Sequence, residues 1–316
     1  MNDSNNNHVS NYAIEAKQIT KSYGSLLALD QVSLHVGAGS IYGLVGDNGA
    51  GKSTFLKLLA GHVFPTAGQI SLFGCSEEKE LCRLRRQTGV LIEQPGLFPN
   101  LTVEQTLEYY RIQKGVPGKA KVTEMLNLVC LSEKRKCICK KLSLGQKQRL
   151  GLAIAMIGEP RLLLLDEPIN GLDPSGIVEF RSLLLRLNRE KQITILISSH
   201  ILPELQQIAT HFGFLSKGRL LEELSRESLQ EKCADYLDIS VSDPELYAAL
   251  LTRHFPEETF QVLPGGTARI RRCLREPEAY SRLATDNGLC IRALERRQST
   301  LENYYMNLKK GGKETC

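Results

Sequence analysis

Residues 46–54 read GDNGAGKST and lie between the apolar run 40–45 and the helical pattern 55–60. This order predicts that a strand ends, the chain turns through glycines and a helix begins. Backbone N–H groups and the positive end of the helix then point into one concavity. Glycine is required because it allows positive φ and has no Cβ to block close approach. The stretch therefore predicts a phosphate-binding loop.

Two side chains in this loop add chemistry that backbone alone does not supply. Lys52 brings a mobile positive charge, and Ser53 offers a hydroxyl to Mg²⁺, the predicted cofactor. An ordinary glycine-rich turn would not need this Lys-Ser pair. The residues predicted to contact a nucleotide are Gly46, Asp47, Asn48, Gly49, Ala50, Gly51, Lys52, Ser53 and Thr54.

Composition limits the class of protein. A chain of 316 residues with 42% hydrophobic residues can form one large domain and a smaller one. Its apolar runs, 162–165 and 193–197, are far shorter than the roughly 20 residues that cross a bilayer. Residues 1–11 are polar and Asn-rich, which predicts a disordered tail instead of a signal peptide. The nine cysteines follow no disulfide or zinc spacing and are expected to be reduced thiols.

Two downstream segments carry further chemistry. Residues 142–146 read LSLGQ before the amphipathic pattern 147–157, so Ser143 and Gly145 begin a helix whose free N–H groups can bind a second anion. Residues 161–168 read RLLLLDEP, a buried-strand run that ends in two acids. At the carboxyl edge of a parallel sheet, such a run places Asp166 and Glu167 beside the phosphates.

These segments together resemble the nucleotide-binding subunit of ATP-binding cassette (ABC) transporters, over about residues 12–222. The phosphate loop is similar to the Walker A motif, LSLGQ to the signature motif, and Asp166 with Glu167 to Walker B and its catalytic acid. The branch that it resembles contains bacitracin and lantibiotic immunity exporters. The implied fold is α/β: a P-loop NTPase cassette with a RecA-like core, an antiparallel β subdomain and a helical subdomain at about 94–155.

The resemblance implies a role for each further residue. Tyr23 in KSYG would stack on adenine; a surface aromatic is the alternative. Asp166 would hold Mg²⁺ through its water shell, and Glu167 would polarise the attacking water as general base. The alternative for these two acids is simple capping of a strand. His200 in ISSH would donate a hydrogen bond to the γ-phosphate, where a filler histidine is the alternative.

Two positions depart from the family pattern. A Gln normally precedes an aromatic-proline element, here 97–99, and aligning on that element places Glu93 at the Gln position. Glu93 is therefore expected to be a catalytic and Mg²⁺-binding residue; the competing interpretation assigns the role to Gln94. The second departure is Leu144, where the best-known signature has glycine, while Gly145 is kept.

In this family the signature and the phosphate loop meet only between two cassettes, so one chain is expected to pair with a second copy or with a homologous cassette. The residues implied to bind the partner's nucleotide are Ser143, Gly145, Gln146 and Asp173, the last within the D-loop-like NGLD. Hydrolysis would remove charge-assisted hydrogen bonds of about 1.5–3 kcal/mol each and open the pair. Pro95, Phe98 and Pro99 are expected to border a groove for a helix of a membrane subunit; ordinary packing is the alternative.

Beyond the cassette, residues 223–316 predict a small α+β domain. Strands are expected at 235–241, 268–272 and 289–294, and helices at 244–254, 277–285 and 300–309. This part resembles the carboxy-terminal extension of some exporter cassettes and shows no catalytic cluster.

The sequence thus predicts the ATP-hydrolysing subunit of an exporter, at the cytoplasmic face of the membrane through a separate transmembrane partner. One alternative is a soluble ABC ATPase acting on ribosomes or nucleic acid; the other is a regulatory cassette without turnover. A basic cluster precedes the signature, formed by Lys134, Arg135, Lys136, Lys140 and Lys141. We interpret it as a solvated face and not a nucleic-acid site.

Overall fold

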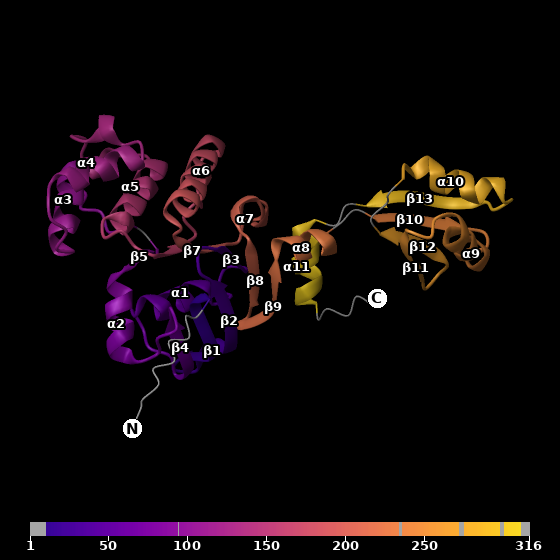
Figure 1. The fold of residues 1–316 in the computed structure, drawn as a ribbon, viewed down its shortest axis with the longest axis horizontal. Coiled ribbons are helices and arrows are strands. Elements are labelled where there is room, and N and C mark those ends of the chain that lie inside the picture. Colours follow the sequence, from indigo (N-terminus) through magenta and orange to yellow (C-terminus); the bar gives the residue numbers. More distant parts are fainter. Residues whose placement is uncertain (1–10, 94, 234–235, 272–274, 298–299, 311–316) are drawn as a thin grey trace, which may run out of the picture. The chain divides into compact units, whose positions relative to one another are not determined.

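The computed structural model describes residues 11–93, 95–233, 236–271, 275–297 and 300–310. The chain divides into two compact units, Met1–Arg226 and Glu227–Cys316 (Figure 1). Each unit is built around its own sheet and core.

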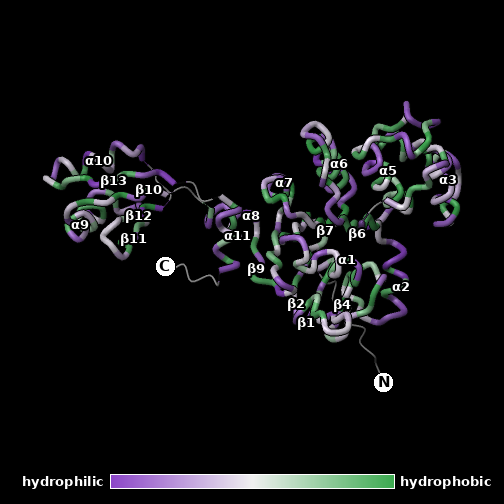
Figure 2. The backbone as a smooth tube through the Cα atoms, turned by 180° about the vertical axis from the view of Figure 1, so that it is seen from behind, coloured by the Kyte–Doolittle hydropathy of each residue, from purple (hydrophilic) through white to green (hydrophobic). Residues whose placement is uncertain are grey.

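The first unit contains a six-stranded sheet with the order β5-β6-β7-β3-β8-β9. The strands β3, β5, β6, β7 and β8 run parallel to one another, and β9 is antiparallel to β8. Every residue of β3, β6 and β7 is buried, as expected for strands covered on both faces. Figure 2 shows the hydrophobic run through β6 and β7. The bounds are β3 Ile41–Val45, β5 Thr88–Leu91, β6 Leu162–Asp166, β7 Thr194–Ser199, β8 His211–Ser216 and β9 Arg219–Ser225.

A three-stranded antiparallel sheet, order β2-β1-β4, completes the core of this unit. Its bounds are β1 Tyr12–Tyr23, β2 Leu26–Gly37 and β4 Ala67–Leu72. Ile14 and Val32 from this sheet share one hydrophobic cluster with Phe55 of α1 and Leu164 of β6. The shared cluster fixes the antiparallel sheet against the phosphate-loop helix, because burial of these side chains depends on both sheets.

Helices connect and cover the strands of the first unit. In the stretch between β5 and β6, α3, α4 and α5 contact one another, and α5 also contacts β5. Elsewhere α1 contacts β6, α2 contacts β4 and β5, and α7 contacts β3. The bounds are α1 Lys52–Ala60, α2 Glu78–Arg86, α3 Val103–Gln113, α4 Ala120–Leu128, η1 Ser132–Lys134, η2 Cys139–Lys141, α5 Leu144–Met156, α6 Pro174–Lys191 and α7 Leu202–Ile208.

The second unit holds a four-stranded antiparallel sheet with the order β11-β12-β10-β13. The chain order β-α-β-β-α-β with this strand order is the ferredoxin-like split βαβ arrangement. Tyr247 and Tyr280 pack with Leu237 and Ile270 in its core. The bounds are α8 Arg226–Lys232, β10 Tyr236–Val241, α9 Pro244–His254, β11 Thr259–Leu263, β12 Thr267–Arg271, α10 Pro277–Asp286, β13 Ile291–Arg297 and α11 Leu301–Lys309.

The predicted α/β class is confirmed, with local differences. Strand β11 was not predicted, although its sequence TFQVL alternates polar and apolar residues at 259–262; the run is only five residues long and none of them is buried. The last strand lies at Ile291–Arg297 instead of 289–294. A domain division after Glu222 would cut β9, which pairs with β8 as far as Ser225. The predictions for residues 1–10, Gln94, Asp235 and Arg272 lie outside the described residues. Among the described helices, none has the length and apolar character needed to span a bilayer.

Candidate functional site

The glycines of the loop between β3 and α1 serve different purposes. Gly49 and Gly51 adopt positive φ, 80° and 109°. Gly46 is not among the positive-φ glycines, but a Cβ there would lie 2.6 Å from the Leu215 carbonyl oxygen. The expectation of positive φ therefore fails at Gly46, where close packing is the reason for glycine. Within the described parts of the chain, no side chain caps α1, which leaves its first N–H groups for an anion.

A cavity of about 490 Å³ opens beside this loop, large enough for a nucleotide. Gly46 and Ala50 are not in its lining, whereas the other predicted loop residues and Tyr23 are. Sequence reasoning missed Leu26, Leu27 and Ala28 of β2, and also Lys217 and Gly218. The lining consists of Tyr23, Leu26, Leu27, Ala28, Asp47, Asn48, Gly49, Gly51, Lys52, Ser53, Thr54, Glu167, Lys217 and Gly218.

Lys217 and Gly218 form the turn between β8 and β9, which is tied to the phosphate loop. The Gly218 N–H donates to the Ala50 carbonyl at 2.9 Å, and the Gly218 carbonyl accepts from the Asp30 N–H at 2.8 Å. Gly218 has a φ of 77°, which favours glycine. Glycine after an apolar run is a turn signal, so the Lys-Gly pair could have indicated this turn from the sequence. Only the tertiary contact brings that turn to the cavity.

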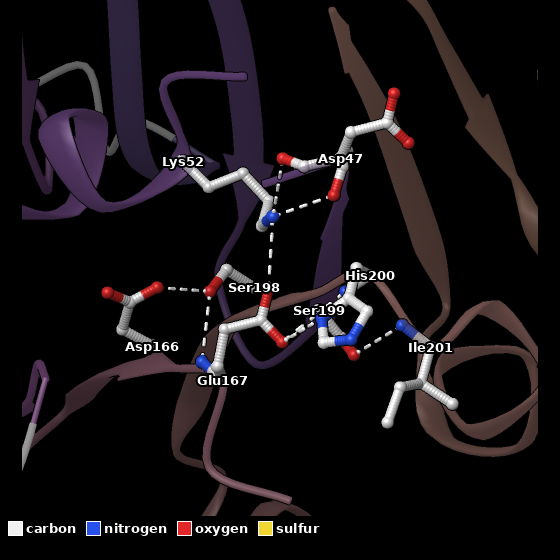
Figure 3. Close-up of polar contacts among 9 residues, drawn as sticks. Asp47, Lys52, Asp166, Glu167, Ser198, Ser199, His200 and Ile201 are labelled. Carbon is white, nitrogen blue, oxygen red and sulfur yellow. Dashed lines mark hydrogen bonds and ion pairs between the residues drawn. The ribbon is translucent and has the colours of Figure 1, made fainter. Parts of the chain in front are cut away.

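The centre of the site is a chain of contacts from Lys52 through Glu167 to His200 (Figure 3). Lys52 is buried, and its Nζ donates to the carbonyls of Gly46 at 2.6 Å and Asp47 at 3.0 Å. The same Nζ lies 3.0 Å from Glu167 Oε1. Glu167 Oε2 is 2.8 Å from His200 Nδ1. The carboxylate therefore sits between an ammonium group and an imidazole.

Asp166 is held separately from its neighbour Glu167. Glu167 has a φ of 47°, which turns the chain sharply after β6, and Figure 3 shows the two carboxylates pointing apart. Asp166 is buried and accepts a hydrogen bond from Ser198 Oγ at 2.6 Å. Ser198 Oγ in turn accepts from the Glu167 N–H at 3.1 Å. Ser198 is a positioning residue that the sequence reasoning did not single out.

The oxygen groups near the loop suit Mg²⁺. Ser53 presents a hydroxyl to the cavity and Asp166 a buried carboxylate, and hard oxygen donors in small number are what Mg²⁺ prefers when phosphates and water complete its shell. Across the described ranges, no group of three or more His, Cys, Asp or Glu residues forms a cage for a metal. An ion held jointly by the protein and a phosphate ligand fits this arrangement.

Glu93 is not brought into the cavity. Its carboxylate lies 2.5 Å from Lys57 Nζ, and its side chain is 64% exposed. The hydrogen bond from Lys57 lowers the pKa of Glu93 below its usual range. In this structure the Glu93 carboxylate pairs with Lys57 and does not line the cavity, and its expected contact with Mg²⁺ stays a prediction.

The signature residues lie at the start of α5. Ser143 Oγ accepts from the Gln146 N–H at 3.3 Å, and Gln146 Oε1 accepts from the Ser143 N–H at 3.1 Å. This reciprocal pair is a capping box, which explains the spacing of Ser and Gln without reference to any ligand. Leu144 is 47% exposed and packs beside the D-loop, since a Cβ on Gly171 would lie 2.9 Å from Leu144 Cδ2.

Asp173 occupies the N-cap position of α6 and accepts from Ser175 Oγ at 2.8 Å. The cavity lining includes none of the four residues predicted to act in trans: Ser143, Gly145, Gln146 and Asp173. Asp166 and His200 do not line the cavity either, but His200 contacts Glu167 and Asp166 is linked to Glu167 through Ser198. The structure therefore separates the predicted residues into a group at or next to the cavity and a signature group.

A groove of about 360 Å³ lies between the segment after β5 and the start of α5. Gln148 is 8% exposed, and its Oε1 has no hydrogen-bond partner among the described residues. Phe98 was expected in this groove but instead packs on Tyr109, with ring centroids 4.7 Å apart. The lining is Pro95, Leu97, Pro99, Cys139, Lys140, Leu144, Lys147 and Gln148.

Comparison with known proteins agrees with this geometry. A family model described as ABC transporter matches residues 29–170, and a model described as AAA domain, putative AbiEii toxin, Type IV TA system matches residues 140–205. The bacitracin transport ATP-binding protein BcrA of Bacillus licheniformis is 38% identical over 95% of this chain and 98% of the relative. The lantibiotic transport ATP-binding protein SrtF of Streptococcus pyogenes is 40% identical over 66% of this chain and 90% of the relative.

A solved structure extends the comparison to three dimensions. An ATP-binding cassette in a dimeric post-hydrolysis state, bound to ADP and Pi, matches 67% of this chain and 98% of its own length. The TM-score is 0.61 and the identity 26%. The predicted cassette fold with its antiparallel β subdomain is thereby confirmed. The chain belongs to the ATP-binding subunits of ABC transporters and is an ATPase of that family.

Proposed function

We propose that this ATPase drives export of an antimicrobial peptide of the bacitracin or lantibiotic type through a separate membrane subunit. The observation that carries the proposal is the similarity to BcrA, which extends over 95% of the chain and so includes the second unit. A peripheral place at the cytoplasmic face of the membrane follows from this role.

In the proposed mechanism, Tyr23 stacks on adenine and the phosphate loop binds the phosphates through its N–H groups. Lys52 is held by two carbonyls and by Glu167. The γ-phosphate competes for the Lys52 ammonium, which frees the Glu167 carboxylate. Glu167 then takes a proton from the water whose oxygen bonds to the γ-phosphorus as the bond to ADP breaks, while His200 orients the Glu167 carboxylate from the other side. ATP binding thus frees the base that ATP hydrolysis requires.

Mg²⁺ fits beside Ser53 and Asp166 and neutralises phosphate charge when bound. The chain's own contribution is to orient the Asp166 carboxylate through the hydrogen bond from Ser198 Oγ. Removing that hydroxyl leaves the carboxylate without its hydrogen-bond donor.

The second half of each site comes from another copy in this proposal. Ser143, Gly145 and Gln146 stand at a helix start whose N–H groups favour an anion. They do not line this chain's own cavity. A partner cassette that brings its nucleotide to this helix start completes both sites, and the dimeric state of the solved relative supports this arrangement.

The groove beside α5 is the proposed contact for the membrane subunit. Lys140 and Lys147 line it with positive charge, and Leu97 and Leu144 with apolar surface. A helix with an apolar face and a carboxylate matches this lining. The alternative functions receive less support, since Glu167 and His200 are in contact as turnover requires, and Arg135 of the basic cluster is paired with Glu104.

The test is bacitracin resistance in a sensitive bacterium that expresses this chain with its membrane subunit. We expect the minimum inhibitory concentration to rise with the native chain and to stay at the background value with Glu167→Gln. The membrane subunit should co-purify with both forms. A native chain that hydrolyses ATP and co-purifies with the subunit but gives no resistance to bacitracin or any lantibiotic would exclude the proposed substrate class.

A further inference from the structure

A third carboxylate stands at the sheet edge that carries Asp166 and Glu167. Strand β5 pairs in parallel with β6, with Leu91 opposite Leu165. Glu93 therefore follows β5 at the same edge where Asp166 and Glu167 follow Leu165. Three acids near one polyphosphate would repel it unless cations compensate them. Lys52 faces the cavity, so a second cation is needed to compensate the negative charge of Glu93.

Lys57 supplies that cation. It lies on α1, the helix that begins with Lys52, and its Nζ is 2.5 Å from Glu93 Oε1. The side chains of Lys57 and Glu93 are 31% and 64% exposed. The hydrogen bond to Glu93 raises the pKa of Lys57, against the lowering effect of partial burial. The parallel pairing of β5 with β6 places the Lys57–Glu93 ion pair at the sheet edge that carries Asp166.

We propose that Lys57 is a positioning residue for Glu93: the ion pair holds this carboxylate outside the nucleotide cavity and compensates its charge beside Asp166. Because Lys57 and Glu93 carry opposite charges, their net charge is zero, as it would be with neutral side chains at both positions. Glu93 also has a φ of 63°, which is not a strand conformation. Its side chain therefore points in a different direction than it would if β5 continued. The proposal rests on the Mg²⁺ site proposed at Asp166.

The consequence concerns the affinity for Mg²⁺ in the ATP complex. With Lys57→Met, the freed Glu93 carboxylate adds negative charge at the metal side of the site, and Mg²⁺ binds more tightly. With Glu93→Gln, the unpaired Lys57 opposes the metal and Mg²⁺ binds more weakly. The double variant has the same net charge as the native pair and should bind Mg²⁺ as the native chain does.

The experiment titrates Mg²⁺ against the full chain with a fluorescent ATP analogue and reads binding, not turnover. We expect Lys57→Met to lower the half-saturating Mg²⁺ concentration about two- to fivefold, the range typical of a solvent-exposed pair. Glu93→Gln should raise it by a similar factor, and the double variant and Lys57→Arg should match the native chain. Lys79→Met on α2 removes a lysine away from the site and is the matched control.

Each result distinguishes between explanations of the Lys57–Glu93 ion pair. If the double variant behaves like Glu93→Gln, then Glu93 ligates the metal directly and the proposal is overturned. If Lys57→Met changes only the melting temperature and not the Mg²⁺ dependence, the pair is merely structural and the proposal is again overturned. A native chain that shows no Mg²⁺-dependent ATP binding would instead overturn the proposed metal site itself.

Discussion

The nucleotide cavity and the signature surface use their side chains in opposite ways. In the cavity, functional groups bond to one another across the fold, as Lys52 does with Glu167 and Glu167 with His200. At the signature surface, Ser143 and Gln146 bond to each other within one helix start, and Leu144 is 47% exposed. The cavity is thus assembled within one chain. The signature surface is rigidly presented, but its proposed ligand comes from another copy.

The largest expected effect breaks the cavity side of this comparison. Glu167→Gln removes the proposed base while keeping the size of the side chain, so ATP turnover should fall about 100- to 10,000-fold. ATP binding should persist, and ATP should retain the protein as a dimer in gel filtration. Glu179→Gln is the matched control, because Glu179 pairs with Arg149 away from the cavity. Turnover near the native rate in Glu167→Gln would remove Glu167 from its assigned role.

The next prediction separates capping from ligand binding at the signature surface. Asp is as good an N-cap as Ser, so Ser143→Asp should keep the stability of the fold, while its negative charge repels the partner's phosphate. ATP-induced dimerisation and turnover should be lost. Ser143→Ala, in contrast, should lower the free energy of unfolding by about 1 kcal/mol.

Mixing two inactive variants sharpens the same point. Lys52→Met lacks a working phosphate loop but keeps its signature, and Ser143→Asp has the reverse defect. A mixed dimer contains one intact composite site, so turnover should partly recover on mixing. Absence of any recovery, with dimers present, would contradict the shared site.

A smaller effect is expected at the exposed rim of the cavity. Tyr23 is 44% exposed, and Lys21 Nζ lies 4.9 Å from its ring centroid. Tyr23→Ala should weaken ATP binding about fivefold, corresponding to a stacking contact of about 1 kcal/mol. Tyr23→Phe should retain the affinity, as measured by equilibrium binding of ATP. Equal affinity of the Ala and native forms would mean that Tyr23 is only a surface aromatic.

Much of the cavity was predictable because its signals are local. The spacing of glycines, Lys52 and Ser53 between an apolar run and a helical pattern predicts a strand, a turn and a helix. The run before Asp166 likewise predicts a buried strand. The position of Ser143 and Gln146 at a helix start was also predictable from local sequence, although the sequence alone did not reveal that they form a capping box.

The contacts that the sequence did not predict join residues far apart in the chain. Ser198 orients Asp166 across two neighbouring strands, the turn at Lys217 and Gly218 reaches the phosphate loop, and Lys57 engages Glu93. No spacing encodes these contacts, because each depends on how sheet and helices pack. The sequence by itself determined the phosphate loop, the acids and the helix starts, since local geometry suffices for them. Only the tertiary structure decided which charges meet, because pairing follows from distance in space.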